Sequence, residues 1–218
     1  MTVPGRVEAA TLLLSLDPPP WLVRHSRAVA EVAGWLAARI EAAGIPVDRR
    51  VVEGGALLHD ADKALPPDDP AKGLRHGDGS AAWLTRMGYP ELARAVANHP
   101  VTRLADEEAY RRWAAFATRE ERVVAYADKR AAQRLEPMAV RFDRWRRRHS
   151  RAVADGDAEG WDESEMRTIW LRASRLEHDV CRAAGVDPAD VSRLRWTGPA
   201  LRAAGGATDS QLASRSAT

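Results

Sequence analysis

Apolar residues recur along most of this chain three and four residues apart, which is the period of an α-helix that buries one face. Alternation with a period of two, typical of a strand, is nearly absent. Prolines, glycines and capping residues separate the periodic stretches. The helices predicted in the first hundred residues cover about 6–16, 21–43, 48–59, 80–87 and 90–99.

The helical pattern continues beyond residue 100. Thr118 and Glu121 form the Thr-x-x-Glu pattern of a capping box, which predicts a helix over about 118–135. The segment 64–79, by contrast, is rich in Pro, Gly and Asp, and we expect a functional loop there. The other predicted elements are helices over about 105–115, from Met138 through Trp145 and from Asp162 through Val180, and a short turn at Asp187. The chain is therefore predicted to be all-α.

Several histidines and acids lie where these helices should be buried. His25 begins the apolar stripe of its helix, and His99 lies at the end of another such stripe. Asp128 falls among the apolar positions of its helix. His59 and Asp60 directly follow the apolar run GALL.

Each of these residues alone has a simpler explanation. A single histidine on an apolar face is usually a core residue with satisfied hydrogen bonds, and Asp128 could pair with Arg130 or another arginine. Buried charges are costly, however, unless they are paired or bound to a metal. A metal site explains the residues together, because Mn, Fe, Co, Ni and Zn accept imidazole and carboxylate ligands. His149 and His178 lack this context and are not predicted as ligands.

The order of these residues resembles that of a known family. His25, then His59-Asp60, then Asp128 follow the His…His-Asp…Asp pattern of the HD superfamily of metal-dependent phosphohydrolases. The blocks HSRAVAEVAGWLA, GGALLHDADK, HGDGSAAWLTRMG, AVANHPVT and RVVAYADKR are similar to those of its symmetrically cleaving dinucleoside tetraphosphatase branch. The resemblance spans about 21–130.

The tetraphosphatase branch has two more histidines between the His-Asp pair and the last aspartate, and here they fall on His76 and His99. His76 lies in the polar loop, so its inclusion depends on the resemblance. The resemblance implies two divalent transition-metal ions (Fe, Mn, Co, Ni or Zn), with Asp60 bridging to a second ion bound by His76 and His99. The implied ligands of the first ion are His25, His59, Asp60 and Asp128.

The same resemblance suggests residues that act on the substrate. Lys63 completes a His-Asp-x-x-Lys pattern, and its ammonium group could bind a phosphate. Asp62 is interpreted either as a general acid for the leaving group or as the partner of Lys63, and the second interpretation is preferred. Arg103 and Lys129 are further candidates for phosphate contact.

The implied architecture is an HD-domain helical bundle over 1–136 with a helical C-terminal extension over 137–196 packed on it. From about residue 197 the chain is rich in Gly, Ala, Ser and Thr, and 197–218 are predicted to be a disordered tail.

Composition adds limits on partners and location. The chain is 45% hydrophobic and 29% charged, as in soluble globular proteins, and no apolar run approaches the ~18 residues of a membrane span. The single cysteine, Cys181, fits a reducing compartment, so we expect a cytoplasmic protein. Net charge is only +2, and one arginine cluster is interpreted as a solvated helix face rather than a nucleic-acid site. That cluster consists of Arg141, Arg144, Arg146, Arg147 and Arg148.

The function expected from these features is metal-dependent hydrolysis of a phosphate ester or anhydride, of a nucleotide or another small phosphorylated metabolite. The sequence after Asp128, KRAAQRLEPM, departs from the tetraphosphatase pattern, so the substrate is expected at this broader level. Two alternatives are a mixed-valent di-iron oxygenase with the same ligands and a non-catalytic nucleotide-binding regulator. No membrane or nucleic-acid partner is expected, and the oligomeric state is left open between monomer and homodimer.

Overall fold

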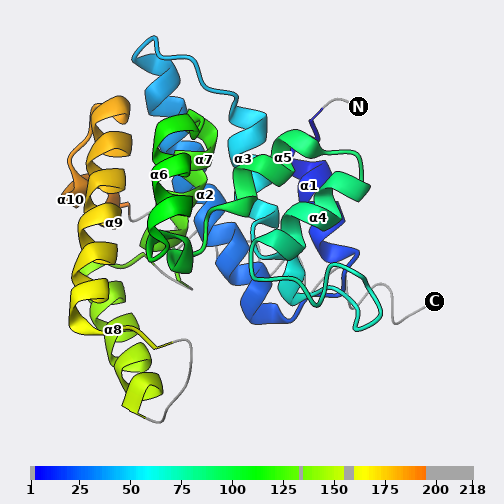
Figure 1. Cartoon of the computed structure of the whole chain (residues 1–218). Helices are drawn as coiled ribbons and strands as arrows, with labels where there is room; N and C mark the ends of the chain where they lie inside the picture. Colours follow the sequence, from blue (N-terminus) through cyan, green and yellow to red (C-terminus); the bar gives the residue numbers. More distant parts are fainter. Residues whose placement is uncertain (1–2, 133–134, 155–159, 195–218) are drawn as a thin grey trace.

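The structure is a computed structural model that describes residues 3–132, 135–154 and 160–194. All regular elements in these residues are helices, which confirms the all-α prediction (Figure 1). The first six are α1 (Arg6–Leu14), α2 (Pro20–Ala42), α3 (Arg49–Leu58), the 3₁₀ helix η1 (Ala61–Lys63), α4 (Asp78–Arg86) and α5 (Pro90–Ala97). The others are the 3₁₀ helix η2 (Val101–Leu104), α6 (Glu107–Phe116), α7 (Arg119–Arg130), α8 (Met138–Ala154), α9 (Glu163–Ala184) and α10 (Pro188–Ser192).

Local capping chemistry sets several of these helix starts. The side chain of Asp48 accepts hydrogen bonds from the backbone N–H groups of the first turn of α3. Thr118 and Glu121 form the predicted capping box at the start of α7. Asp162 and Glu165 form another at the start of α9.

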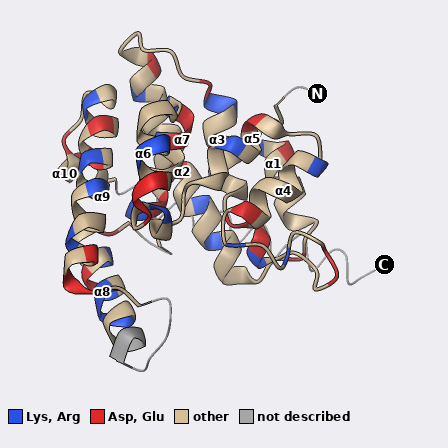
Figure 2. Ribbon diagram, viewed as in Figure 1, with Lys and Arg blue, Asp and Glu red and all other residues tan. Residues whose placement is uncertain are grey.

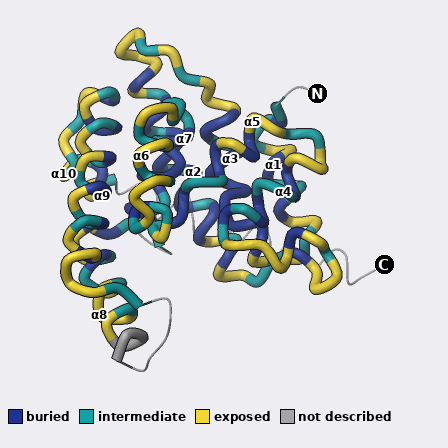
Figure 3. Tube along the Cα trace, in the orientation of Figure 1, coloured by how far each residue is buried: buried dark blue, intermediate teal, exposed yellow. Residues whose placement is uncertain are grey.

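The main core forms around α2, which is buried along most of its length and packs against α3, α7 and α9 (Figure 3). Helix α3 also contacts α1 and α5, and α4 pairs with α5 on the side away from α9 (Figure 1). Gly55 of α3 lies so close to its neighbours that a Cβ atom there would stand 3.2 Å from Ala95 of α5 and 3.4 Å from Val124 of α7. This close packing brings the carboxyl end of α3 next to α5 and α7.

Helix α7 is shorter than predicted. It ends at Arg130 rather than near Leu135, because Ala131 is extended and forms an isolated antiparallel bridge with Leu135. The buried guanidinium group of Arg130 donates to Glu177 of α9 and Ser192 of α10. Tertiary contacts therefore end the helix where its sequence period would continue.

The C-terminal helices contribute to two apolar clusters. Leu176, Val180 and Cys181 of α9 belong to the main core. Met138 and Phe142 of α8 pack instead with the first half of α9 and with η2 in a second cluster. The domain limits at 136 and 196 stay predictions, and the expected disordered tail at 197–218 lies outside the described residues.

None of the helices in the described part of the chain is both long and apolar enough to cross a membrane.

Candidate metal centre

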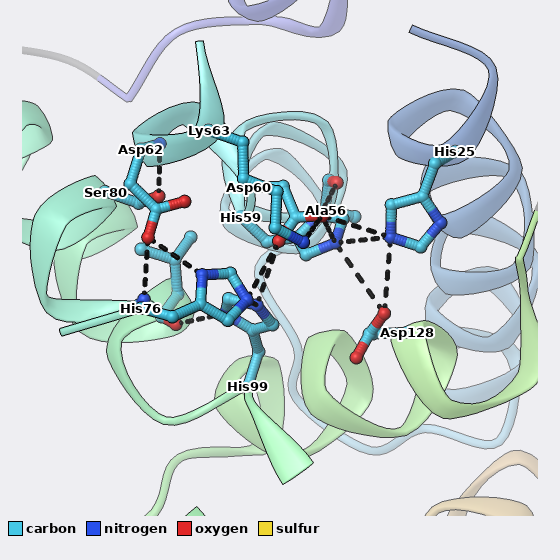
Figure 4. Close-up of polar contacts among 12 residues, drawn as sticks. His25, Ala56, His59, Asp60, Asp62, Lys63, His76, Ser80, His99 and Asp128 are labelled. Atoms are coloured by element: carbon cyan, nitrogen blue, oxygen red, sulfur yellow. Dashed lines mark hydrogen bonds and ion pairs between the residues drawn. The ribbon is translucent and has the colours of Figure 1, made fainter. Parts of the chain in front are cut away.

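The six residues predicted from the sequence as metal ligands lie together in one cluster (Figure 4). Two project from helices, His25 from α2 and Asp128 from α7. The other four come from segments next to helix ends. His59 and Asp60 directly follow α3, His76 precedes α4, and His99 follows α5.

One half of the centre is built around His25. Its Nε2 atom lies 3.1 Å from His59 Nε2, 3.4 Å from Asp128 Oδ1 and 3.3 Å from Asp60 Oδ2. His59 is fully buried, and Asp60 is 1% exposed. One metal ion among these atoms would meet nitrogen and oxygen donors from three separate elements.

The other half is built around the second oxygen of Asp60. Oδ1 of Asp60 lies 3.2 Å from His76 Nε2 and 3.3 Å from His99 Nε2. The two Nε2 atoms are themselves 3.2 Å apart. Each oxygen of Asp60 therefore faces a different pair of histidines.

The hydrogen bonds of the four imidazole rings show that the centre fits metal ions. Nδ1 lies 2.7 Å from a backbone carbonyl oxygen in both His59 and His99, and 3.0 Å from one in His25. Nδ1 of His76 lies 2.8 Å from a carboxylate oxygen of Asp62. Because Nδ1 donates in each ring, the Nε2 lone pairs of the neutral rings converge, as in metal sites with oriented histidine ligands. Lone pairs facing each other at this distance require a cation between them.

The buried carboxylates of the centre also require a cation nearby. Burial raises the pKa of Asp60 and Asp128, but neighbouring histidines outweigh it and keep both pKa values well below the usual range. Oδ1 of Asp60 is buried and accepts no hydrogen bond from the described residues. A buried anion with an unused oxygen is suited to bind a metal ion.

Protons take the place of metal ions in the metal-free protein. Burial lowers the pKa of His25, but Asp128 and Asp60 outweigh burial and raise it to about 9. Asp60 and Asp62 similarly raise the pKa of His76 to about 9 against the effect of burial. Burial lowers the pKa of His59 to about 3, so this ring stays neutral and available as a ligand.

Lys63 and Asp62 lie beside the centre, but they do not pair with each other. Nζ of Lys63 lies 2.6 Å from Asp60 Oδ2, with the amino group on the ring face of Trp21 at 5.9 Å from its centroid. Oδ2 of Asp62 accepts from His76 Nδ1 and, at 2.9 Å, from the backbone N–H of Gly77. The preferred interpretation of Asp62 as the partner of Lys63 was therefore wrong, and Asp62 orients His76 instead.

Arg103 and Lys129 have contacts that sequence analysis did not foresee. Arg103 forms an ion pair with Asp78 in the first turn of α4. Lys129 is 3% exposed, and its ammonium group donates to the backbone carbonyls of His99 at 2.8 Å and Ala125 at 3.1 Å. Burial lowers the pKa of Lys129 to about 8. Lys129 thus supports the segment that carries His99, and phosphate contact by either residue stays a prediction.

Two residues near the centre were missed. The hydroxyl of Ser80 in α4 accepts from the backbone N–H of Asp62 at 2.9 Å, and it fixes the turn from which Asp62 reaches His76. Arg141 in α8 lies 4.0 Å from Asp128, although its cluster was interpreted as a solvated face. One sequence feature could have indicated that Arg141 is not on the solvated face: it lies three residues after Met138, beside the apolar stripe of α8.

The fold and the centre define a class of protein, namely an all-helical protein whose buried histidines and aspartates can bind metal ions. The sequence profile of the HD domain family matches residues 22–133, a little over half of the chain, and all six candidate ligands lie within that range. The chain belongs to the HD domain family. Comparison with curated proteins and with solved structures gave no match.

Proposed function

We propose that this protein is a metal-dependent phosphohydrolase that uses two divalent transition-metal ions. The observation that carries the proposal is the convergence of four oriented imidazole rings on the two oxygens of Asp60. Family membership supports the same chemistry, since HD domain proteins are generally metal-dependent hydrolases. The narrower dinucleoside tetraphosphatase activity depends only on the sequence blocks between residues 21 and 130.

The positions of the ligand atoms support two groups of ligands. His25, His59 and Asp128 would hold the first ion, and His76 and His99 would hold the second. Asp60 has one oxygen near each group and would contribute to both. Two such ions would supply an activated water and charge neutralisation on the phosphate oxygens.

The protein groups around the ions then position the substrate. Lys63 is the only residue of the predicted phosphate-binding set whose ammonium group is both beside Asp60 and well exposed, with 37% of its side chain accessible. Binding of a phosphate by Lys63 would exchange its contact with Asp60 for a contact with substrate oxygens. Asp62 keeps His76 in place by accepting from its Nδ1 atom, which leaves proton transfer to the leaving group as an untested second role.

Metal analysis of the purified protein followed by a substrate screen tests the proposal. We expect two equivalents of bound metal and release of phosphate from some members of a nucleotide and phosphoester panel with Mn, Fe or Co. His59→Ala should abolish turnover, whereas the exposed His178→Ala should not. The absence of any hydrolysis product, whether phosphate or a shorter nucleotide, from the fully loaded protein on the whole panel would contradict the proposal.

Further measurements on the same protein distinguish the hydrolase from the two alternatives, a di-iron oxygenase and a non-catalytic regulator. Turnover that requires dioxygen, with a mixed-valent iron signal in electron paramagnetic resonance, would favour the oxygenase. Wild-type behaviour of His59→Ala in cells would favour a non-catalytic regulator. Full hydrolytic activity under anaerobic conditions, lost in His59→Ala, would exclude both.

A further inference from the structure

A cavity of about 200 Å³ lies beside the metal centre, between α7, η2 and α8. Asp128 belongs to both sites, because its Oδ1 atom faces His25 at 3.4 Å and the Arg141 guanidinium group at 4.0 Å. The cavity wall is basic and partly aromatic. Its lining includes Asp128, Lys129, Arg141, Arg144, Trp145 and Arg148.

The position of these side chains follows from the helical period of α8. Arg141, Trp145 and Arg148 are four and then three residues apart, so they lie on one face of the helix. Phe142 is buried against α9, and Arg141 lies 4.0 Å from Asp128, so this face is turned toward α7. The segment lies beyond residue 133, outside the part of the chain that matches the HD domain family.

Helix α8 carries both basic and acidic residues (Figure 2), and its described arginines differ in whether an acidic side chain pairs with them. Arg146 and Arg147 form ion pairs with Asp143, and Arg144 pairs with Glu136 at 3.0 Å. These three arginines therefore have acidic partners on or next to their own helix.

Within the described residues, neither Arg141 nor Arg148 has an acidic partner on or next to α8. Nη1 of Arg141 is buried and forms no hydrogen bond with the described residues. Arg148 is exposed and has no ion pair within the described part of the chain. The carboxylate of Asp128 lies 4.0 Å from Nη2 of Arg141, which is too far for a hydrogen bond and leaves the buried Nη1 group unsatisfied.

We propose that this cavity is an anion subsite in which Arg141 and Arg148 bind a second phosphate group of the substrate. Two guanidinium groups suit the planar, multidentate contacts of a phosphate, and a buried donor without a partner has the most to gain from one. The inference rests on the proposed function, and it narrows the substrate class to a molecule with two phosphate groups, a phosphoanhydride or a bisphosphate.

Binding of inorganic pyrophosphate to the metal-free, full-length protein tests the subsite without any turnover. Isothermal titration calorimetry should show binding by the wild type, weakened about tenfold in Arg141→Ala and in Arg148→Ala, as expected for the loss of one charged hydrogen-bonding group. Arg141→Lys should retain part of the affinity because it keeps the positive charge.

Arg146→Ala is the matched control, since it removes an exposed arginine of the same helix that is paired with Asp143 and does not line the cavity. Its affinity for pyrophosphate should stay within about twofold of the wild type. Circular dichroism checks the fold of each variant. If Arg141→Ala does not fold, Arg148→Ala still tests the subsite, because Arg148 is exposed and its substitution should not disturb the fold.

Unchanged pyrophosphate binding in Arg148→Ala would overturn the subsite, whatever the hydrolysis assay shows. Equal weakening in Arg146→Ala would also overturn it, because the arginines would then act only as a diffuse positive surface. Arginine-dependent binding by a protein that hydrolyses nothing would leave the subsite standing and contradict the proposed hydrolase instead.

Discussion

At the scale of single residues, the centre depends on which atom of each ring carries a proton. His59 and His99 donate from Nδ1 to carbonyls of their own preceding turn, three residues earlier in both cases. These local hydrogen bonds direct both Nε2 atoms to the centre without the help of a long-range contact. His76 has no such carbonyl and depends on Asp62, which makes its orientation the more easily lost.

Substitution of Asp62 should selectively weaken binding of the proposed second metal ion. Asp62→Ala removes the acceptor for His76 and leaves the backbone N–H of Gly77 without its partner. Loss of such an orienting group typically lowers metal affinity about 10- to 100-fold. Metal titration should therefore show one weakened equivalent and one unchanged. Asp68→Ala, an exposed aspartate in the same loop, should bind both ions as the wild type does.

The pKa of His25 predicts how stability depends on pH in the metal-free protein. A pKa raised from 6.5 to about 9 means that the folded state binds the proton more tightly than the unfolded state. The stabilisation is therefore fully present below about pH 6.5 and is lost as the pH rises through about 9.

Urea unfolding of metal-free protein should show this loss as a lower free energy of unfolding at pH 9 than at pH 6.5. The decrease should be smaller in His25→Gln, which has no proton to lose. An equal decrease in both proteins would show that His25 does not contribute to it.

At the scale of helices and loops, the centre is assembled mainly from helix ends. Only His25 and Asp128 lie within helices, while the other four ligands lie in short segments next to α3, α4 and α5. Their backbone is fixed by turns rather than by helical hydrogen bonds. The turn before α4 requires a glycine, because Gly77 has a φ of +86°.

Gly77→Ala should therefore displace His76 from the centre. A Cβ atom at this position would stand 2.8 Å from the carbonyl oxygen of Ala97, in a backbone conformation that costs other residues about 1–3 kcal/mol. We expect a lower free energy of unfolding by at least that amount and weaker binding of one metal ion. Gly73→Ala in the same loop meets no atom within 4 Å and should leave both quantities unchanged.

At the scale of the whole molecule, the C-terminal helices are joined to the metal-binding part by polar as well as apolar contacts. The guanidinium group of Arg130 in α7 is 2% exposed and donates to Glu177 at 2.6 Å, to Tyr126 at 2.9 Å and to Ser192. Glu177 also accepts from the hydroxyl of Tyr126 at 2.9 Å. This network connects α7, which carries Asp128, to α9 and α10.

Arg130→Ala should destabilise the protein as a whole. Removal of one partner of a buried ion pair typically costs about 3–5 kcal/mol, because the remaining charge stays buried without compensation. Chemical unfolding should show a loss of this size in one cooperative transition. Arg112→Ala, which breaks an exposed pair with Glu108 at 2.7 Å, should change the free energy of unfolding by less than about 1 kcal/mol.

The sequence by itself determined most of the helices and the set of candidate ligands. Apolar periodicity and capping boxes such as Thr118-Glu121 are local, so they predict where helices start without knowledge of the fold. His25 and Asp128 were found because a polar residue on an apolar stripe is conspicuous at helical spacing. His76 lacks a periodic context, and only its place in a family block pointed to it.

Only the tertiary structure decided which side chains meet across elements. It paired Asp62 with His76 rather than with Lys63, turned Lys129 toward the backbone of His99, and brought Arg141 to Asp128. Such contacts join residues up to thirty positions apart through the packing of separate helices. The pattern of residues along the sequence does not predict that packing, because the distance between two helices depends on all the side chains between them.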